Sequence, residues 1–210
     1  MRLMIASDIH GSALYCRQML EAYEREKADR LLLLGDILYH GPRNDLPEEY
    51  APKQVIAMLN PVRENLLCVR GNCDTEVDQM VLEFPILAEY CLLELDGQTI
   101  FATHGHNFNP EHLPMLKKRD ILMNGHTHVP ACEDKKTYIY MNPGSVSIPK
   151  EDSVHSYMIY ENNLKINQRI IAGNAQFTGI AAGRGVRFTT GLLLLGKGLG
   201  MRETPIRPHS

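Results

Sequence analysis

RLMIASDIHG, residues 2–11, is the stretch that decides the fold of this chain. Residues 2–7 form a short apolar run typical of a buried strand, and Asp8, Ile9 and His10 follow it directly. Residues two apart on an extended backbone point the same way, so Asp8 and His10 can converge on one point while Ile9 faces the core. The stretch predicts a buried strand that ends in one oxygen and one imidazole ligand.

Short apolar runs and amphipathic segments alternate over the next part of the chain. Residues 13–27 have the apolar periodicity of a helix, and Ser12 stands where its cap would be. Residues 51–59 are a second helix candidate between the apolar runs 30–34 and 66–69. This order predicts a βαβαβ unit with a parallel sheet.

The pattern changes after Phe84. Residues 86–95 and 98–103 flank Asp96-Gly97, a strong hairpin signal, so we expect the second half to be antiparallel. Further strands are expected at 120–123, 137–141, 156–160 and 164–171, with a tight turn at 161–163. A parallel half and an antiparallel half together predict two sheets packed face to face.

The composition divides the chain into one folded domain, residues 1–171, and a glycine-rich C-terminal segment, residues 172–210. Beyond Asn167 the only acidic residue is Glu203, whereas basic residues persist and glycine becomes dense. We interpret residues 172–210 as a disordered extension, or as an artefact of cloning or of the reading frame.

The bulk charge and the cysteines limit the partners and the compartment. The formal net charge of the 210 residues is -3, which gives no basic field for stable nucleic-acid binding. The five cysteines are an odd number without a C-x-x-C pair, which predicts a reducing, cytoplasmic location. We expect no signal peptide and no membrane span, because the apolar run 192–195 is far too short. An exposed sheet edge makes a homo-oligomer reasonable.

Two further clusters follow the other strands of the predicted parallel sheet. Gly35-Asp36 comes after the second apolar run, and Asn72, within Arg70-Gly71-Asn72-Cys73-Asp74, comes after the third. Ligands bind beyond the carboxyl ends of parallel strands, so Asp8, Asp36 and Asn72 are expected at one edge. In isolation each cluster is explained equally well as a cap or a turn.

The histidines favour a metal site. Of the nine histidines, four fall in two short motifs, THGH at 103–106 and GHTH at 125–128. Each motif ends a predicted strand, and the i, i+2 spacing directs both imidazoles to one side. A lone histidine is more often a hydrogen-bonded polar group than a ligand, but two such pairs at strand ends have little structural reason.

The number of donors indicates two ions. The candidate metal ligands are Asp8, His10, Asp36, Asn72, His104, His126 and His128. A tetrahedral zinc site takes only four ligands. The set instead suits two ions roughly 3.5 to 4 Å apart that share one carboxylate, the geometry used in phosphoryl transfer.

The order of these motifs resembles the calcineurin-like metallophosphoesterase superfamily. The details GPRN (41–44), RGNCDTEVD (70–78) and NPGSVSIP (142–149) resemble the YfcE-type bacterial phosphodiesterases in particular. The likeness covers residues 1–167. It implies an α/β fold, a four-layer αββα sandwich of two mixed β-sheets flanked by helices.

The resemblance also implies a chemistry. It assigns Asp8, His10 and His128 to one metal and Asn72, His104 and His126 to the other, with Asp36 bridging. Two divalent ions, with Mn²⁺ the usual one, would activate a bridging hydroxide that hydrolyses a small phosphodiester. The alternatives are a phosphomonoesterase with the same mechanism, or a non-catalytic scaffold such as the retromer subunit of this fold.

Five side chains are predicted to contact the substrate or to support the metal ligands. Asn72 would stabilise charge on the phosphoryl oxygens, and Asp74 would accept a hydrogen bond from a ligand imidazole or, alternatively, cap a turn. Arg43 would contact the phosphate or form a surface salt bridge. Cys73 stands where many family members have a proton-donating histidine, so protonation of the leaving group would come from elsewhere, with His106 one candidate.

Overall fold

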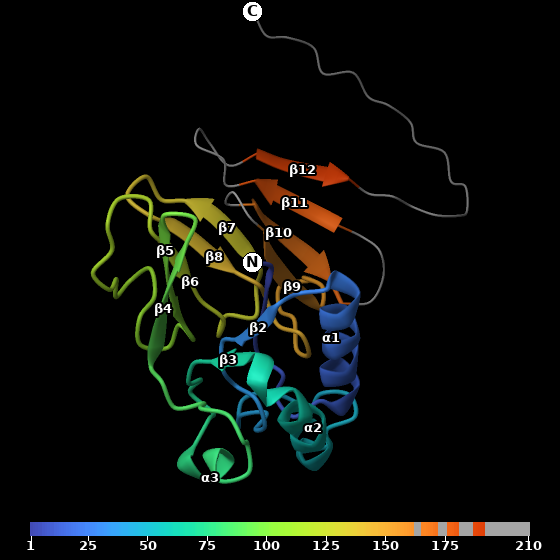
Figure 1. The fold of residues 1–210 in the computed structure, drawn as a ribbon. Helices are drawn as coiled ribbons and strands as arrows, with labels where there is room; N and C mark the ends of the chain where they lie inside the picture. Colours follow the sequence, from blue (N-terminus) through green and yellow to red (C-terminus); the bar gives the residue numbers. More distant parts are fainter. Residues whose placement is uncertain (162–164, 172–175, 181–186, 192–210) are drawn as a thin grey trace, which may run out of the picture.

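The structure is a computed structural model that describes residues 1–161, 165–171, 176–180 and 187–191. Its core consists of two β-sheets packed face to face, with helices on the outer side of one of them (Figure 1). The larger sheet has the order β12-β11-β10-β9-β1-β2-β3, and the smaller has the order β4-β5-β6-β8-β7.

The larger sheet consists of β1 (Leu3–Ala6), β2 (Arg30–Leu33), β3 (Leu66–Cys68), β9 (Ser156–Glu161), β10 (Lys165–Ile170), β11 (Gln176–Ile180) and β12 (Arg187–Gly191). The smaller sheet consists of β4 (Tyr90–Leu95), β5 (Gln98–Thr103), β6 (Ile121–Met123), β7 (Ala131–Asp134) and β8 (Ile139–Asn142). The helices are α1 (Ala13–Glu26), α2 (Pro52–Leu59), α3 (Glu76–Gln79) and the short 3-10 helix η1 (Asn60–Asn65).

The predicted βαβαβ unit is confirmed. Strand β1 pairs in parallel with β2, and β2 pairs in parallel with β3. Helix α1 begins after Ser12, whose hydroxyl accepts a hydrogen bond from the Tyr15 N–H, and ends at Lys27 in the left-handed conformation. Pro52 occupies the first turn of α2, where its missing N–H costs nothing.

The second half differs from the prediction of an antiparallel sheet. The hairpin β4–β5 is antiparallel, but β6 runs parallel to both β5 and β8, so the smaller sheet is mixed. Strand β9 pairs antiparallel with β1, which places the last predicted strands in the larger sheet. Strand β7 was not predicted. The period of a strand shows which face is buried but not which strand lies beside it.

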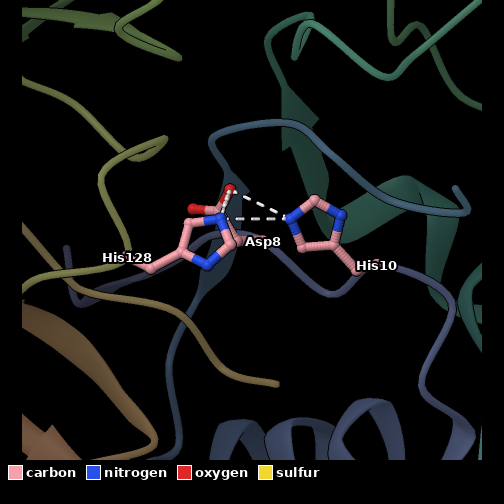
Figure 2. A group of neighbouring side chains, drawn as sticks. All are labelled: Asp8, His10 and His128. Carbon is pink, nitrogen blue, oxygen red and sulfur yellow. Dashed lines mark hydrogen bonds and ion pairs between the residues drawn. The ribbon is translucent and has the colours of Figure 1, made fainter. Parts of the chain in front are cut away.

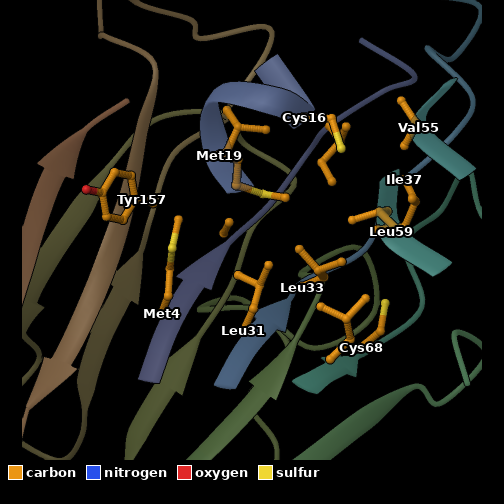
Figure 3. Packing of buried hydrophobic residues seen from close by; sticks show 14 of the residues in the cluster. Met4, Cys16, Met19, Leu31, Leu33, Ile37, Val55, Leu59, Cys68 and Tyr157 are labelled. Atoms are coloured by element: carbon orange, nitrogen blue, oxygen red, sulfur yellow. The ribbon is translucent and has the colours of Figure 1, made fainter. Parts of the chain in front are cut away.

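Apolar side chains fill the two interfaces of the larger sheet. Leu3, Ile5 and Leu32 point toward the smaller sheet and pack against residues such as Met123. On the opposite face Met4, Leu31 and Leu33 pack against α1 and α2 through side chains such as Met19 and Leu59 (Figure 3). Because successive side chains of a strand alternate between faces, one four-residue strand contributes to both cores.

The outer face of the smaller sheet carries Phe101, Leu122 and Tyr140. Phe108 and Leu116, from the segment between β5 and β6, pack against them. In the described part of the chain this loop, rather than a helix, forms the outer layer on that side. The predicted fold class, an α/β sandwich of two mixed β-sheets flanked by helices, is confirmed.

The domain prediction remains a prediction. Strands β11 and β12 lie within the segment 172–210, and their backbones pair antiparallel with β10 and with each other. The rest of that segment, and most of the turn predicted at 161–163, fall outside the described residues. Among the described helices, none combines the length and the apolar character that crossing a membrane requires.

The core between the sheets predicts a large effect at Leu32. Its side chain is fully buried, so Leu32→Ala should lower the free energy of unfolding by about 2–5 kcal/mol through lost burial and a cavity. Leu46, which is 61% exposed, is the matched control. Leu46→Ala should change the free energy of unfolding by less than about 0.5 kcal/mol. Urea denaturation followed by circular dichroism measures both, and similar losses in the two variants would contradict the packing.

Candidate metal centre

The three parallel strands bring their polar residues to one edge of the larger sheet. The loops after β1 and β2 are joined by backbone hydrogen bonds, from the Asp8 N–H to the Gly35 carbonyl (3.2 Å) and from the His10 N–H to the Asp36 carbonyl (2.9 Å). Asn72 follows β3 at the same edge. The predicted juxtaposition of Asp8, Asp36 and Asn72 is therefore what the topology produces.

The smaller sheet contributes the histidines. His104 follows β5, and His126 and His128 follow β6, the strand that runs parallel to β5. The two sheets meet here directly, because the His126 N–H donates to Oδ2 of Asp8 at 3.1 Å. All seven predicted ligands thus lie together at the junction of the two sheets.

The backbone of this site is held in an uncommon conformation. Five of the seven candidate ligands have left-handed φ angles, namely Asp8 (59°), His10 (49°), Asp36 (56°), His126 (65°) and His128 (63°). Non-glycine residues rarely adopt this region, and such strain clusters at functional sites. The hydroxyls of Ser145 and Ser147 donate to the Asp8 carbonyl at 2.9 and 2.8 Å and help to hold it. Both serines belong to the motif NPGSVSIP, but only the structure shows what they contact.

Asp8, His10 and His128 form the first group of ligands (Figure 2). Oδ1 of Asp8 lies 3.2 Å from Nε2 of His128 and 3.5 Å from Nε2 of His10, and the two Nε2 atoms are 3.2 Å apart. The two contacts of Asp8 do not have hydrogen-bond geometry, since within the described residues its buried Oδ1 has no hydrogen-bond partner. Such an orphaned carboxylate oxygen facing two imidazole nitrogens fits a bound cation.

The second group surrounds His104. Its Nε2 lies 3.0 Å from Oδ1 of Asn72, 3.2 Å from Nδ1 of His126 and 3.4 Å from Oδ2 of Asp36. The same Oδ2 of Asp36 is 3.6 Å from Nε2 of His10, a member of the first group. Asp36 therefore stands between the groups, where a shared ligand is needed.

The backbone fixes the tautomers of three histidines. Nδ1 of His10, His104 and His128 contacts the carbonyl oxygens of Tyr39 (2.8 Å), Leu34 (2.6 Å) and Ile148 (2.6 Å). A carbonyl oxygen only accepts, so each Nδ1 carries a hydrogen and each Nε2 faces the centre. This arrangement is the usual one for histidines that bind a metal.

The buried charges make the centre a strong attractor for positive charge. Burial alone would raise the pKa of Asp8, but its contacts with His10 and His128 hold this pKa well below the ordinary value. Burial would lower the pKa of His104, yet the nearby Asp36 and Asp8 raise it to about 9. The buried carboxylates thus favour the protonated form of His104. Divalent cations would neutralise the charge of these carboxylates more fully.

Of the two roles predicted for Asp74, the structure shows the one in which its carboxylate caps backbone N–H groups. Its carboxylate accepts hydrogen bonds from the backbone N–H groups of Asp36 (2.8 Å), Ile37 (2.9 Å) and Gly71 (2.7 Å), so the expected bond from a ligand imidazole is wrong. These contacts join the loop after β2 to the loop after β3. Burial raises the pKa of Asp74, partly offset by these hydrogen bonds.

A cleft of about 50 Å³ opens onto the centre, and it contains two of the predicted substrate contacts, Arg43 and Cys73. Asn44 and Lys150 also line this cleft. Asn44 belongs to the GPRN motif, but neither residue was predicted to contact the substrate, because a single asparagine or lysine in a loop does not indicate a contact. Burial and the neighbouring Asp36 raise the pKa of the Cys73 thiol to about 12. The thiol therefore stays neutral.

His106 lies beside the centre rather than in the lining of the cleft. Its ring centroid is 5.5 Å from that of His104 and 6.4 Å from that of His126. Burial, together with the charge of His104, lowers its pKa. The structure therefore places this predicted substrate contact near the ligands without showing a path to the substrate.

The fold is that of a metallophosphoesterase. The chain matches the calcineurin-like phosphoesterase superfamily domain over residues 1–164 and belongs to this superfamily. The predicted family and the predicted phosphoesterase class of enzyme are confirmed.

Individual relatives agree with this assignment. The chain is 50% identical to phosphodiesterase YfcE of Escherichia coli K12 over 164 residues, which cover 78% of this chain and 89% of the relative. The solved structure of YfcE from E. coli superposes with a TM-score of 0.81 at 46% identity, covering 84% of this chain and 96% of that chain. Vacuolar protein sorting 29 of Cryptosporidium parvum shares the fold alone. Its structure has a TM-score of 0.57 at 18% identity, and the match covers 90% of this chain and 95% of that chain.

The contacts of Asp74 predict a loss of stability that does not depend on a metal. Asp74→Asn keeps the size of the side chain but leaves fewer acceptors for three buried N–H donors, so the metal-free protein should lose about 1–3 kcal/mol of unfolding free energy. The exposed Asp45 is the control, and Asp45→Asn should have little effect. Thermal and urea denaturation in the presence of a chelator test this, and equal stability of the two variants would argue against the bracing role.

Proposed function

We propose that this protein is a metal-dependent phosphodiesterase that hydrolyses small phosphate diesters at two divalent ions. The observation that carries the proposal is the position of Asp36, whose Oδ2 faces His10 of one ligand group and His104 of the other. The 50% identity to phosphodiesterase YfcE supports the preference for diesters.

The residues divide between the two ions according to their contacts. Asp8, His10 and His128 would hold one ion, while Asn72, His104 and His126 would hold the other, with Asp36 shared. When bound, the two ions would polarise the phosphoryl oxygens and supply a hydroxide between them near neutral pH. Mixed oxygen and imidazole ligands suit a first-row divalent metal, and Mn²⁺ is the ion we propose.

The remaining residues orient the substrate and balance its charge. Oδ1 of Asn72 faces His104, which leaves its amide Nδ2 at the cleft, where it contacts the Cys73 thiol at 3.2 Å and can donate to a phosphoryl oxygen. Arg43 and Lys150 line the same cleft and place positive charge beside the bound phosphate. Asp74 fixes the loops that present Asp36 and Asn72.

The cysteines, the net charge and an exposed sheet edge support proposals about location, partner and assembly. All five cysteines are unpaired, which supports a reducing, cytoplasmic location. The charge of -3 supports a small diester rather than a stably bound nucleic acid as partner. Strand β4 is an edge of the smaller sheet with Tyr90 and Leu92 exposed, which supports self-association.

Metal dependence and the role of His128 are tested with bis(4-nitrophenyl) phosphate and 4-nitrophenyl phosphate. Chelator-stripped protein should be inactive, and added Mn²⁺ should restore hydrolysis of the diester. His128→Ala removes a ligand of one ion and should lower kcat/KM by about 100-fold or more. The exposed His112 is the control, and His112→Ala should retain full activity.

The two esters also separate the alternatives. Faster hydrolysis of the monoester would make the protein a phosphomonoesterase. Failure to hydrolyse either ester with two ions bound would favour a scaffold that keeps its metal site.

The neutral thiol of Cys73 predicts how the rate depends on the leaving group. A thiol is a weaker proton donor than the imidazolium of a histidine, so diesters with acidic phenols should react fastest and Cys73→Ser should change kcat by less than about threefold. Cys91→Ser, at a half-buried position on β4, is the control for thiol removal. Rates for a series of aryl diesters measure this, and a steep loss in Cys73→Ser alone would show that the thiol participates.

A further inference from the structure

An apolar groove of about 390 Å³ lies beside the cleft, between the loop after β2, helix α2 and helix α3. Its apolar lining includes Leu38, Tyr39, Tyr50, Ile56, Val77 and Val81. Three of these side chains are open to solvent, Tyr39 at 43%, Val77 at 69% and Val81 at 44%. Large apolar side chains that are exposed together around a hollow are typical of a binding site.

The groove and the cleft are neighbours, since Cys73 lines both. Gly41, in the lining of the cleft, comes close to this shared residue, because a Cβ atom at its position would be 3.2 Å from Sγ of Cys73. No side chain rises from the loop at this point. The groove is also tied to the metal ligands, since the carbonyl of Tyr39 accepts the hydrogen bond from Nδ1 of His10.

The charges of the two hollows differ. The cleft contains the cations Arg43 and Lys150, which suit a phosphate. The charged residue in the lining of the groove is Asp78, and its Oδ2 already accepts hydrogen bonds from the Thr75 N–H and hydroxyl, each at 2.8 Å. The groove therefore offers no cation to a second anion.

Aromatic rings form one end of the groove. Tyr39 and Tyr50 both line it, and the ring of His40 lies edge-on to each, with centroid distances of 4.8 and 5.3 Å. This fixed set of ring faces and edges is complementary to another planar ring more than to a flexible alkyl chain.

We propose that the apolar groove binds an uncharged aromatic or heteroaromatic ring carried by one ester group of the substrate. The phosphate occupies the cleft, and the ring passes over Gly41 and Cys73 into the groove. The substrates are then phosphodiesters of ring-bearing alcohols rather than of simple alkyl alcohols. This inference rests on the proposed phosphodiesterase function, because it assumes that the phosphate binds at the metal centre.

Two phosphodiesters of equal charge test the inference, dimethyl phosphate and methyl phenyl phosphate. Their dissociation constants are measured by calorimetry on the full chain loaded with Mn²⁺, and the phenol and methanol released during each titration are quantified so that the heat of any hydrolysis is subtracted. Burial of the ring should make methyl phenyl phosphate bind about tenfold more tightly. Equal affinity of the two compounds would overturn the inference.

The double variant Val77→Asn/Val81→Asn locates the ring preference. It introduces polar but neutral groups into the groove, so the ratio of the two dissociation constants should fall below about threefold while dimethyl phosphate binds as before. Val154, 42% exposed and outside both hollows, is the matched control, and Val154→Asn should keep the full ratio. If the double variant does not fold, Val77→Asn alone, at the more exposed position, should still lower the ratio.

Hydrolysis measured in parallel separates the inference from the proposed function. An unchanged ratio in the groove variants, with normal hydrolysis of bis(4-nitrophenyl) phosphate, would overturn the ring site and leave the phosphodiesterase intact. Binding of neither compound, together with no hydrolysis, would overturn both.

Discussion

The buried carboxylates of Asp8 and Asp36 are the constraint on which the rest of the site depends. Both lie almost entirely away from water, where an unpaired negative charge costs several kcal/mol. Four imidazoles and an amide converge on them, and without a metal a proton on His104 serves as the counter-charge. A site built in this way favours cations, and whatever binds the folded form alone also stabilises it.

This arrangement requires a rigid support, because five of the candidate ligands are held with left-handed backbone angles. The support comes from residues that do not themselves face the centre. Asp74 fixes the loops after β2 and β3, while Ser145 and Ser147 fix Asp8 in the loop after β1. Two packed apolar cores hold the strands from which these loops emerge. The positions of the candidate ligands therefore depend both on the packing of the strands and on the hydrogen bonds that hold the loops.

The surface around the centre is divided by chemistry. On one side a small polar cleft with Arg43 and Lys150 suits the phosphate, which is common to all phosphoesters. On the other side the larger apolar groove has room for a group that differs from one ester to another. Selectivity among substrates would then come from hydrophobic burial next to the centre, whereas the proposed reaction would depend on the buried candidate ligands.

The sequence by itself determined the βαβαβ unit, the β4–β5 hairpin at Asp96-Gly97 and the candidate ligands that the fold brings together, because periodicity, turn residues and paired histidines are local signals. Only the tertiary structure decided that β9 pairs with β1, that Asp74 contacts backbone amides, and that Lys150 and Val81 border the site. Strand partners and pocket walls are set by contacts between residues far apart in the chain, and one sequence carries no local mark of such contacts.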